Sequence, residues 1–447
     1  MSFDLPDLPE DWTYAPLDSL SQPNSATYGV VQPGAALEAG KPLIRVNNFR
    51  DTRIDLTDVM YIAPEIEAKY SRTRLKGGEV LITIVGSVGQ VAVVPSRLCG
   101  FNVARAVAVI HPLPHIAPEW IALCLRSPLS QHLLGSRANT TVQTTINLKD
   151  LRALPVPLPP VEVRHAISDF VGALDDRITL LRETNATLEA IAQALFKSWF
   201  VDFDPVRAKM EGRAPEGMDE ATAALFPDSL EETELGVVPR GWRWGALSDL
   251  ATFQNGYAFK SKDWTDAGHP VVKIGDVKPG MIDLVGCSYV AEATVAGLDR
   301  FRLSRGDLVV GMTGYVGEAG LVPSVEPTAY LNQRVGRMAT KSGIADLGVV
   351  YCAARSPAFK ESAIAQSHGS AQANVSGYSL MAFQMAIGPA PLAEHFNSVV
   401  ADLLEGILLN HEQAQTLSTL RDTLLPRLIS GQLRVAEAQT AVEKNFA

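Results

Sequence analysis

The amino-acid sequence predicts an α+β protein built from two pseudo-repeated, mixed α/β lobes that are separated by two long helices packed as an antiparallel coiled coil. Three observations predict this fold class: an internal repeat at an offset of 228–230 residues, short β-rich runs between glycines and prolines in each copy, and a leucine heptad after each lobe. With 447 residues, the chain is long enough for about two to four domains with their own cores.

The repeat is clearest over 24 ungapped positions, where 72–95 and 300–323 share nine identical residues against about one or two expected by chance. The Trp12 segment returns at Trp242, and the Arg-Ser-Pro sequence that begins at Arg126 returns at Arg355. An offset that changes by no more than two residues along the chain indicates duplicated structure. We therefore predict one lobe over residues 1–158 and a second over 237–388.

Each lobe is predicted to contain an irregular sheet with helices outside it. β-branched and aliphatic residues gather in short runs bounded by Gly and Pro, which is typical of strands. Apolar segments at 118–125 and 347–354 indicate helices. The predicted strands are 43–46, 80–85, 91–94 and 107–110 in the first lobe, and 271–274 and 308–312 in the second.

After Pro159 and Pro160, the apolar pattern changes to that of a long helix. Leucines recur every seven residues, and an asparagine interrupts the seam in each copy, at Asn185 and Asn410; such a polar residue can fix the register of a coiled coil. We predict spacer helices over 159–201 and 389–430, each about 60 Å long at about 1.5 Å per residue. The alternative is that each apolar stripe packs on its own lobe. The predicted pairing residues are Leu174, Ile178, Leu181, Asn185, Leu188, Leu195, Leu403, Ile407, Leu417 and Leu424.

Between the first helix and the second lobe, residues 202–236 are predicted to form an acidic linker. The segment 200–236 carries 3 basic and 10 acidic residues, which accounts for seven of the ten excess negative charges in the chain. We expect this segment to be exposed to solvent, because a run of like charges repels itself and stays hydrated. Residues 431–447 are predicted to form a C-terminal tail.

Composition and targeting signals predict a soluble, cytoplasmic protein that has no membrane partner. The first seven residues are acidic and interrupted by proline, so they do not resemble a signal peptide. No apolar run approaches the length of a membrane span, and the four cysteines are widely spaced, as expected in a reducing compartment. The net charge of −10 leaves the lobes near neutral once the acidic segment is set aside.

The sequence lacks the familiar catalytic motifs. It contains no amino-methyltransferase motif of the Asp/Asn-Pro-Pro-Tyr/Phe type, no complete phosphate-binding glycine loop, no Gly-x-Ser-x-Gly elbow and no nuclease acid cluster. His111 and His115 have helical spacing, but Pro112 and Pro114 exclude a helix there, so no metal site is expected. The chain is therefore predicted to be non-catalytic, without metal-ligating residues and without a cofactor of its own.

Polar residues gather beside strand ends and glycine turns in both copies, and these are the candidate DNA-binding residues. Arg, Asn, Gln and Ser can pair with base edges, and Arg and Lys also bind phosphates. For any one of them, the alternative is a solvated surface residue or a strand-end hydrogen bond. The candidates are Arg45, Asn47, Arg50, Arg72, Arg74, Ser87, Asn102, Arg105, Arg137, Asn139 and Gln143 in the first copy, and Lys273, Asp276, Arg300, Arg302, Tyr315, Asn332, Arg334, Arg337, Gln372 and Asn374 in the second.

Three segments together resemble the specificity subunit of Type I restriction–modification systems. They are GWRWGALSDLATFQNGYAFK at 241–260, LFKSWFVDFDP at 195–205 and LLPRLISG at 424–431. The resemblance extends over essentially the whole chain and agrees with the repeat. The first lobe departs from it, because DWTYAP at 11–16 lacks the Asn-Gly-Tyr-Ala-Phe stretch that is present at 255–259.

The resemblance implies two target-recognition domains, each reading half of an asymmetric bipartite DNA sequence, with the two helices setting the spacer. It also implies a complex with two modification subunits, which methylate adenine with S-adenosylmethionine, and with restriction subunits that use ATP and Mg. Trp199, Phe200 and Phe203 would then form a partner-binding surface; a hydrophobic plug where helix meets lobe is an equal alternative. Two other functions stay open: a two-lobed scaffold that binds only protein, and an unrecognised enzyme.

Overall fold

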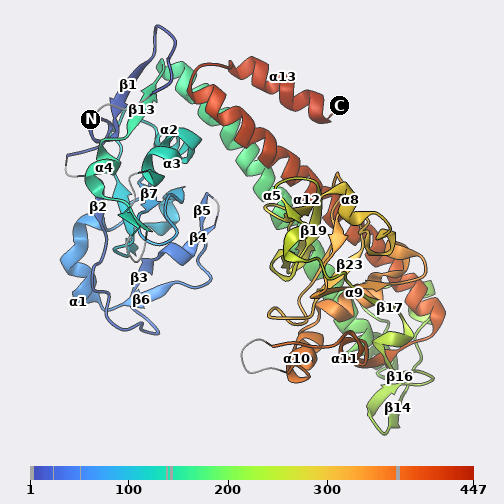
Figure 1. The fold of residues 1–447 in the computed structure, drawn as a ribbon. Coiled ribbons are helices and arrows are strands. Elements are labelled where there is room, and N and C mark those ends of the chain that lie inside the picture. Colours follow the sequence, from blue (N-terminus) through green and yellow to red (C-terminus); the bar gives the residue numbers. More distant parts are fainter. Residues whose placement is uncertain are drawn as a thin grey trace. The chain divides into compact units, whose positions relative to one another are not determined.

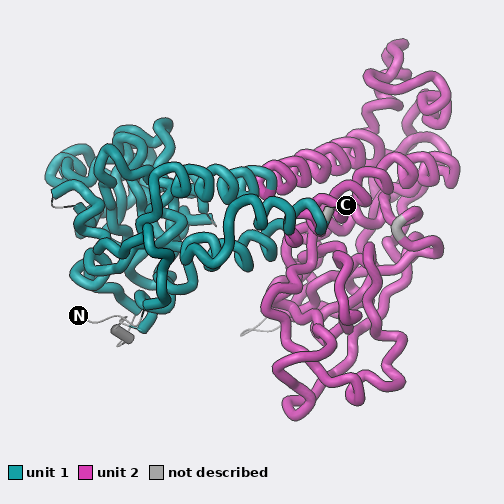
Figure 2. The backbone as a smooth tube through the Cα atoms, turned by 90° about the horizontal axis from the view of Figure 1, so that it is seen from above, with its two compact units in different colours: residues 1–177, 417–447 teal, residues 178–416 magenta. Residues whose placement is uncertain are grey.

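The computed structural model describes residues 5–23, 25–50, 52–136, 139–140, 144–368 and 373–446. Its chain divides into two compact units, which Figure 2 colours separately: residues 1–177 with 417–447 form unit 1, and residues 178–416 form unit 2. The first lobe lies in unit 1 and the second in unit 2. Each of the two long helices contributes one part to each unit.

Unit 1 is built around a four-stranded antiparallel sheet in the order β2, β10, β7, β8, with β7 and β10 buried along their whole length. Side chains alternate between the two faces: Ile82 belongs to the core that contains Trp120 of α2, whereas Leu81 belongs to a second core with Ile44. Both faces of the sheet are therefore covered. The elements of this lobe are β1 (Thr13–Pro16), β2 (Thr27–Tyr28), β3 (Lys41–Ile44), β4 (Phe49–Arg50), β5 (Arg53–Ile54), β6 (Met60–Ile62), α1 (Pro64–Glu67), β7 (Val80–Thr83), β8 (Val91–Val93), β9 (Asn102–Val103), β10 (Val107–Ile110), α2 (Pro118–Arg126), α3 (Pro128–Gly135), β11 (Asn139–Thr140), β12 (Thr144–Thr145), α4 (Leu148–Arg152), β13 (Pro155–Leu158) and short 3-10 helices at Leu17–Leu20, Val46–Asn48, Ala68–Thr73 and Ser96–Leu98.

Unit 2 contains the second lobe, whose main sheet has six strands in the order β17, β26, β23, β24, β21, β20. The central strand β23 is fully buried and runs antiparallel to β24 and β26, and its Leu308 and Val310 share a core with Tyr351 of α9. The elements are β16 (Arg243–Ala246), β17 (Thr252–Asn255), β18 (Trp264–Thr265), β19 (His269–Val272), β20 (Val277–Lys278), β21 (Gly280–Ile282), β22 (Ser288–Val290), α8 (Glu292–Val295), β23 (Leu308–Gly311), β24 (Ala319–Leu321), β25 (Tyr330–Leu331), β26 (Val335–Ala339), α9 (Gly348–Arg355), α10 (Pro357–Ala365), α11 (Gly377–Met381), β27 (Gln384–Ile387) and short 3-10 helices at Leu247–Asp249, Ser261–Asp263, Ile274–Asp276, Asp299–Phe301 and Gly343–Asp346.

Each lobe is closed by a two-stranded ladder between its first and last strands. Thr13 of β1 lies opposite Leu158 of β13, and Arg243 of β16 lies opposite Ile387 of β27, both in antiparallel pairs. Between these ladders, β7, β8 and α2 of the first lobe recur in the same order as β23, β24 and α9 of the second. Figure 1 labels β7 and α2 in the first lobe and β23 and α9 in the second. The repeated sequence therefore folds into repeated structure.

Two helices of 40 residues follow the lobes, α5 (Val161–Phe200) and α12 (Ala390–Ile429), and they run side by side in Figure 1. In unit 2, Asn185 of α5 bonds to Asn410 of α12, and the Phe196 ring of α5 meets the Phe396 ring at 6.2 Å, so the pairing is antiparallel. In unit 1, Asp175 and Arg421 join the same two helices. The predicted α+β fold class is thus confirmed.

No helix in the described part of the chain is apolar enough along its length to cross a membrane. Buried seam residues include Leu174, Ile178, Leu181, Ile407, Leu417 and Leu424, and half-buried ones Asn185, Leu188, Leu195 and Leu403.

The acidic segment after α5 is folded, which differs from the exposed linker expected from its charge. It contains α6 (Asp204–Met210), α7 (Glu220–Ala224) and a hairpin of β14 (Leu230–Thr233) and β15 (Gly236–Pro239). Its few apolar residues account for the difference, because Val206, Ala208 and Phe226 are buried. The C-terminal segment likewise forms a helix, α13 (Val435–Phe446), whose Ala438 is buried in the core of unit 1.

Candidate nucleic-acid interface

A glycine turn after β7 forms the first part of the candidate site in unit 1. Gly86 and Gly89 have φ of +82° and +89°, a region that favours glycine. The Thr83 hydroxyl donates to the Ser87 carbonyl at 2.6 Å and accepts from the Gln90 amide at 2.9 Å. These bonds fix the turn to the end of the strand and leave Ser87 exposed.

Two further predicted groups lie at the same end of this sheet. Thr83 of β7 is opposite Val107 of β10, so the exposed Arg105, just before β10, lies beside the turn. The polar loop that precedes α4, residues 137–145, reaches the turn as well, because the Gly86 amide donates to the Thr144 carbonyl at 3.1 Å. Arg137 and Gln143, which were also predicted in this loop, lie outside the described residues, and so does the side chain of Asn139.

The second lobe joins its glycine turn to its polar loop in the same way. The Gly314 amide donates to the Ala373 carbonyl at 2.9 Å, and the Thr313 hydroxyl donates to Oδ1 of Asn374 at 2.7 Å. Gly314 has a φ of +73°, again in the region that favours glycine. Gln372 lies outside the described residues.

An exposed arginine and an exposed turn residue complete the second copy. The Met312 amide donates to the Arg334 carbonyl at 3.1 Å, so Arg334 borders the turn as Arg105 does in the first lobe. Tyr315, which replaces Ser87 in the repeat, is 64% exposed. Each lobe therefore presents a turn, an arginine and a polar loop at one end of its sheet, and the side chains at the turn differ between the copies. We call this arrangement the sheet-end cluster.

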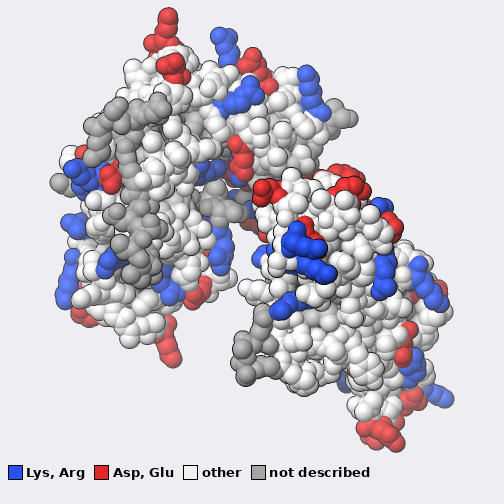
Figure 3. Space-filling view, in the orientation of Figure 1, with Lys and Arg blue, Asp and Glu red and all other residues white. Residues whose placement is uncertain are grey.

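The surface charge is mixed. On the face drawn in Figure 3, the Lys and Arg side chains stand in separate groups among Asp and Glu. This distribution agrees with the near-neutral lobes expected from the sequence. A face on which the two signs are interspersed gains limited non-specific attraction to phosphates.

Three other candidates in the first lobe bind acidic neighbours at the surface. Arg45 and Asn47 both donate to Oδ2 of Asp58, at 2.9 and 2.8 Å, and Arg50 lies 3.6 Å from the Asp55 carboxylate. Sequence reasoning missed Asp58, which is separated from Arg45 by 13 positions and is 75% exposed. Such exposed pairs are weak, so their side chains can exchange a carboxylate for another anion.

Arg74 and Asn102 both bind the buried carboxylate of Glu67, although the Arg74 side chain itself is 42% exposed. Arg74 donates to both oxygens of Glu67, at 2.8 and 2.6 Å, and these bonds hold the pKa of Glu67 below its usual range although burial opposes this. Asn102 is fully buried; its Nδ2 donates to Glu67 at 3.1 Å and its Oδ1 accepts from the Thr73 hydroxyl at 2.8 Å. These contacts fasten the 3-10 helix at 68–73 to β9. Arg72, two residues earlier than Arg74, is exposed.

The arginines around β26 in the second lobe also bind within the lobe. Arg337 donates to Asp307 at 3.0 Å and to Oε1 of Gln254 at 2.8 Å. Arg302 donates to the Tyr330 hydroxyl at 3.1 Å, and the Arg300 guanidinium lies 4.8 Å from the centre of the Phe301 ring. Arg302 is half exposed and Arg300 is exposed, so both side chains also meet solvent.

Lys273, Asp276 and Asn332 are more enclosed. The Asp276 carboxylate accepts from the Lys273 backbone amide at 2.8 Å and so caps a 3-10 turn, and burial raises the pKa of Asp276 despite this bond. The Lys273 ammonium donates to the Ser288 hydroxyl and lies 5.0 Å from the centre of the Trp264 ring. Asn332 is 7% exposed. These contacts favour structural roles for the three residues.

The aromatic run at the end of α5 is covered by the chain itself, which corrects its prediction as a partner-binding surface. Trp199, Phe200 and Phe203 are each no more than 6% exposed. Phe200 and Phe203 meet the Trp242 ring at 5.6 and 5.7 Å, and Trp199 meets Phe396 at 5.4 Å. These rings instead fill the space between the end of α5 and the second lobe, as the alternative interpretation of a hydrophobic plug predicts. Aromatic side chains gain most free energy by such burial.

Sequence reasoning missed the side chains that fasten the lobes to the helices, although a signal was present. The Arg-Ser-Pro repeat marks Arg126 and Arg355, and each of these arginines pairs with an acid on α5: Arg126 with Asp175 at 3.0 Å, and Arg355 with Glu189 at 3.2 Å. Arg305 adds a contact to α12, donating to Glu412 at 2.7 Å and to Glu405 at 2.8 Å. The acidic partners had no marker in the sequence.

The described residues contain no group of three or more His, Cys, Asp or Glu side chains placed to hold a metal ion. Of the four cysteines, Cys124, Cys287 and Cys352 are buried. Burial, together with the nearby Asp276 carboxylate, raises the pKa of Cys287 to about 12, so its sulfur stays a neutral thiol.

Comparison with known proteins agrees with this architecture. Residues 9–190 match the family model described as the Type I restriction modification DNA specificity domain. The chain is 37% identical over 198 residues to the Type I restriction enzyme EcoBI specificity subunit of Escherichia coli, a match that spans 42% of each protein, and 26% identical over 419 residues to the HindI specificity subunit of Haemophilus influenzae, spanning 81% of this chain and 88% of that one. The crystal structure of a Type I restriction–modification S subunit from M. genitalium has the same fold, with a TM-score of 0.50 at 15% identity, over 96% of this chain and 98% of that one.

Proposed function

We propose, from the premise that this chain belongs to the family of Type I restriction–modification specificity subunits, that it reads an asymmetric, bipartite DNA sequence through its two lobes. The observation that carries the proposal is the sheet-end cluster, which occurs once in each lobe. The backbone arrangement of the cluster is the same in both lobes, but the side chains differ, since Ser87 stands where the second lobe has Tyr315. Two identical lobes would read a palindrome, whereas these two read different half-sites.

The chemistry of the cluster suits base readout in a groove. Arg105 and Arg334 can donate two hydrogen bonds to one guanine, and the Ser87 hydroxyl can bond to several base edges. Tyr315 offers a ring and a hydroxyl on a protruding turn. The glycines allow the backbone of each turn to approach a duplex closely, because they have no side chain.

In this proposal, α5 and α12 set the distance between the half-sites. Each helix has 40 residues and is therefore about 60 Å long at about 1.5 Å per residue. That length corresponds to an upper bound of about 18 base pairs at about 3.4 Å each.

The chain is non-catalytic in this proposal and directs chemistry that its partners perform. Two modification subunits would bind S-adenosylmethionine and methylate adenine, and restriction subunits would use ATP and Mg for cleavage. The charge of the chain supports such a division, since a protein with a net charge of −10 and near-neutral lobes depends on partners for much of its phosphate attraction. This chain itself would hold no cofactor.

Methylation mapping tests the proposal. Plasmid DNA from cells that co-express this chain with its neighbouring methyltransferase is expected to carry methyl-adenine at one bipartite, asymmetric motif. The matched control is the chain with Arg105→Ala and Arg334→Ala, for which we expect weaker methylation, because each base-contacting arginine contributes about 1–3 kcal/mol. If the complex assembles but methylates at no motif, or if the double variant methylates as the natural chain does, the scaffold function replaces this one.

A further inference from the structure

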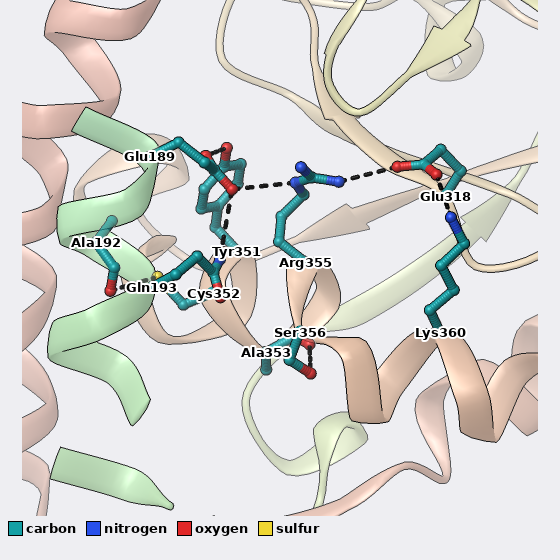
Figure 4. Close-up of polar contacts among 10 residues, drawn as sticks. All are labelled: Glu189, Ala192, Gln193, Glu318, Tyr351, Cys352, Ala353, Arg355, Ser356 and Lys360. Carbon is teal, nitrogen blue, oxygen red and sulfur yellow. Dashed lines mark hydrogen bonds and ion pairs between the residues drawn. The ribbon is translucent and has the colours of Figure 1, made fainter. Parts of the chain in front are cut away.

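The turn of the second sheet-end cluster continues directly into a buried carboxylate. Glu318, which follows the turn 314–317, is 7% exposed. It accepts from Nη1 of Arg355 at 2.9 Å and from Nζ of Lys360 at 2.7 Å (Figure 4). A Cβ on Gly317 would lie 2.8 Å from the Ala363 Cβ, so this end of the turn packs directly on α10.

The same arginine reaches α5 on its other side. Arg355 Nε donates to Oε1 of Glu189 at 3.2 Å, and the fully buried Tyr351 donates its hydroxyl to the other oxygen of Glu189 (Figure 4). Burial lowers the pKa of Arg355, but the nearby Glu189, Tyr351 and Glu318 raise it by more. The net result is a raised pKa, so the guanidinium keeps its charge. Burial and the Glu189 charge also raise the pKa of Tyr351 well above its usual value, so the hydroxyl keeps its proton. A continuous chain of charged hydrogen bonds therefore joins the turn to the helix.

The first lobe has equivalent positions but a different connection. Gln131 takes the place of Lys360 and donates to the Gly89 carbonyl at 3.0 Å, so a neutral bond holds the turn. Gln90 takes the place of Glu318, and Arg126, the equivalent of Arg355, pairs with Asp175 of α5. In this lobe the arginine joins α2 to the helix without an acidic partner next to the turn. The two lobes thus provide a natural comparison between a turn that is linked to α5 by charge and one that is not.

We propose that Arg355 is a positioning residue for DNA recognition by the second lobe. Acting through Glu318, it fixes the turn that carries Tyr315 relative to α5, and reading of the second half-site depends on this link. The inference rests on the proposed function and adds a specificity-determining residue that does not itself touch DNA. Arg126 stabilises the first lobe but does not set the position of its turn.

The test measures half-site discrimination by the complex of the full chain with its methyltransferase partner. Three duplexes are compared: the mapped target, and two versions in which one half-site is altered. The ratio of affinities gives a discrimination factor for each half-site. Tyr315→Ala identifies the half-site read by the second lobe, because it removes the exposed ring from that turn alone. Arg355→Gln is then compared with Arg126→Gln, which breaks the equivalent arginine link in the first lobe.

We expect Arg355→Gln to lower the discrimination factor of the Tyr315-dependent half-site by about fivefold or more, the lower end of the effect of one base contact, and to leave the other half-site unchanged. Arg126→Gln is expected to leave both discrimination factors unchanged, even if it lowers the thermal stability of the protein as much as Arg355→Gln does. Arg355→Lys should restore part of the discrimination. If Arg355→Gln does not fold, Glu189→Gln is used instead. It places a neutral group of the same shape at the α5 end of this chain of hydrogen bonds, and it should lower the discrimination factor of the same half-site only.

Two results would overturn the positioning role while leaving the proposed function intact. One is a folded Arg355→Gln complex with both discrimination factors at the natural values. The other is an equal loss at both half-sites, which would indicate general loosening of the protein. A natural complex that discriminates at neither half-site would overturn the proposed function, and this inference with it.

Discussion

Asn410 of α12 donates a hydrogen bond from Nδ2 to Oδ1 of Asn185 of α5 at 2.9 Å, within the helix pair of unit 2. Asn185 in turn donates to the Ile407 carbonyl at 2.9 Å. Both asparagines interrupt an otherwise apolar seam. A polar pair at such a position selects one register of the two helices, because any sliding leaves its amides without partners.

Breaking this pair from one side should destabilise unit 2. Asn410→Leu leaves Oδ1 of the half-buried Asn185 without its donor, and we expect the free energy of unfolding to fall by about 1–3 kcal/mol in urea denaturation. The double variant Asn185→Leu with Asn410→Leu should recover most of that loss, because two apolar side chains then meet. Leu409→Asn, at a position that is 54% exposed, is the control and should change stability by less than about 0.5 kcal/mol. A single variant as stable as the natural chain would contradict the role of the pair.

If α5 and α12 set the spacer as proposed, it is expected to lengthen only when both helices are extended together. The sequence alone suggests inserting one heptad after Leu188, but the Leu188 side chain packs beside Gly406 of α12, so a change in α5 alone would shift the pairing beyond that point. Seven residues inserted after Thr179 and seven after Gln415, on the same side of the asparagine pair, keep the seam in phase. We expect the gap in the methylated motif to grow by about 3 base pairs, from about 10 Å of added helix, with both half-sites unchanged. Altered half-site bases in the mapped motif would rule out the spacer role.

Two candidate residues of the first lobe should respond in opposite ways. Asn102→Ala removes a buried amide that donates to Glu67 and accepts from the Thr73 hydroxyl. We therefore expect the free energy of unfolding to fall by about 1–3 kcal/mol. Arg72→Gln changes an exposed side chain, so stability should stay the same, while DNA affinity falls and its slope against salt concentration decreases by about one. Denaturation and salt-dependent binding are measured on both variants. A salt slope for Arg72→Gln equal to the natural one would remove Arg72 from the interface.

The second lobe contains a contact between His269 and Glu292, away from its sheet-end cluster, that we expect to depend on pH. His269 Nε2 lies 2.5 Å from the Glu292 carboxylate and its Nδ1 lies 2.9 Å from the Thr328 carbonyl, so the doubly protonated ring satisfies both acceptors. The bond to Glu292 raises the pKa of His269 above its usual value, although burial opposes the shift. The stabilisation is therefore fully present below about pH 6.5 and is lost as pH rises through the raised pKa.

Glu292→Gln tests this sign. The denaturation midpoint of the variant should fall below that of the natural chain at about pH 6, and the difference should shrink by about pH 9. An NMR titration of the His269 ring gives the direct measurement. A ring that titrates at or below about 6.5 would show that Glu292 does not hold the proton there.

The long elements could be predicted from the sequence because their signals are local. The heptad pattern predicts helices over 159–201 and 389–430, and α5 and α12 span Val161–Phe200 and Ala390–Ile429. Strands such as β7 and β10 were also found, since a buried strand between glycines and prolines is marked within a few residues.

The exposure of individual polar residues could not be predicted in this way, because it depends on partners distant in the chain. Arg337 is held by Asp307 and by Gln254, which are 30 and 83 positions away. Asn102 meets Glu67 across 35 positions. The aromatic run at 199–203 was equally ambiguous, because an apolar patch looks the same in sequence whether it faces a partner protein or the chain's own lobe.

The ladders that close the lobes have a consequence for how far each lobe can change. Because β1 pairs with β13 and β16 with β27, the chain enters and leaves each lobe at neighbouring points. What lies between can change in size, and here one main sheet has four strands and the other six, without moving the point at which the following helix begins. The segment between the two strands of a ladder can therefore be replaced as one closed unit, while the helix that follows still begins at the same point.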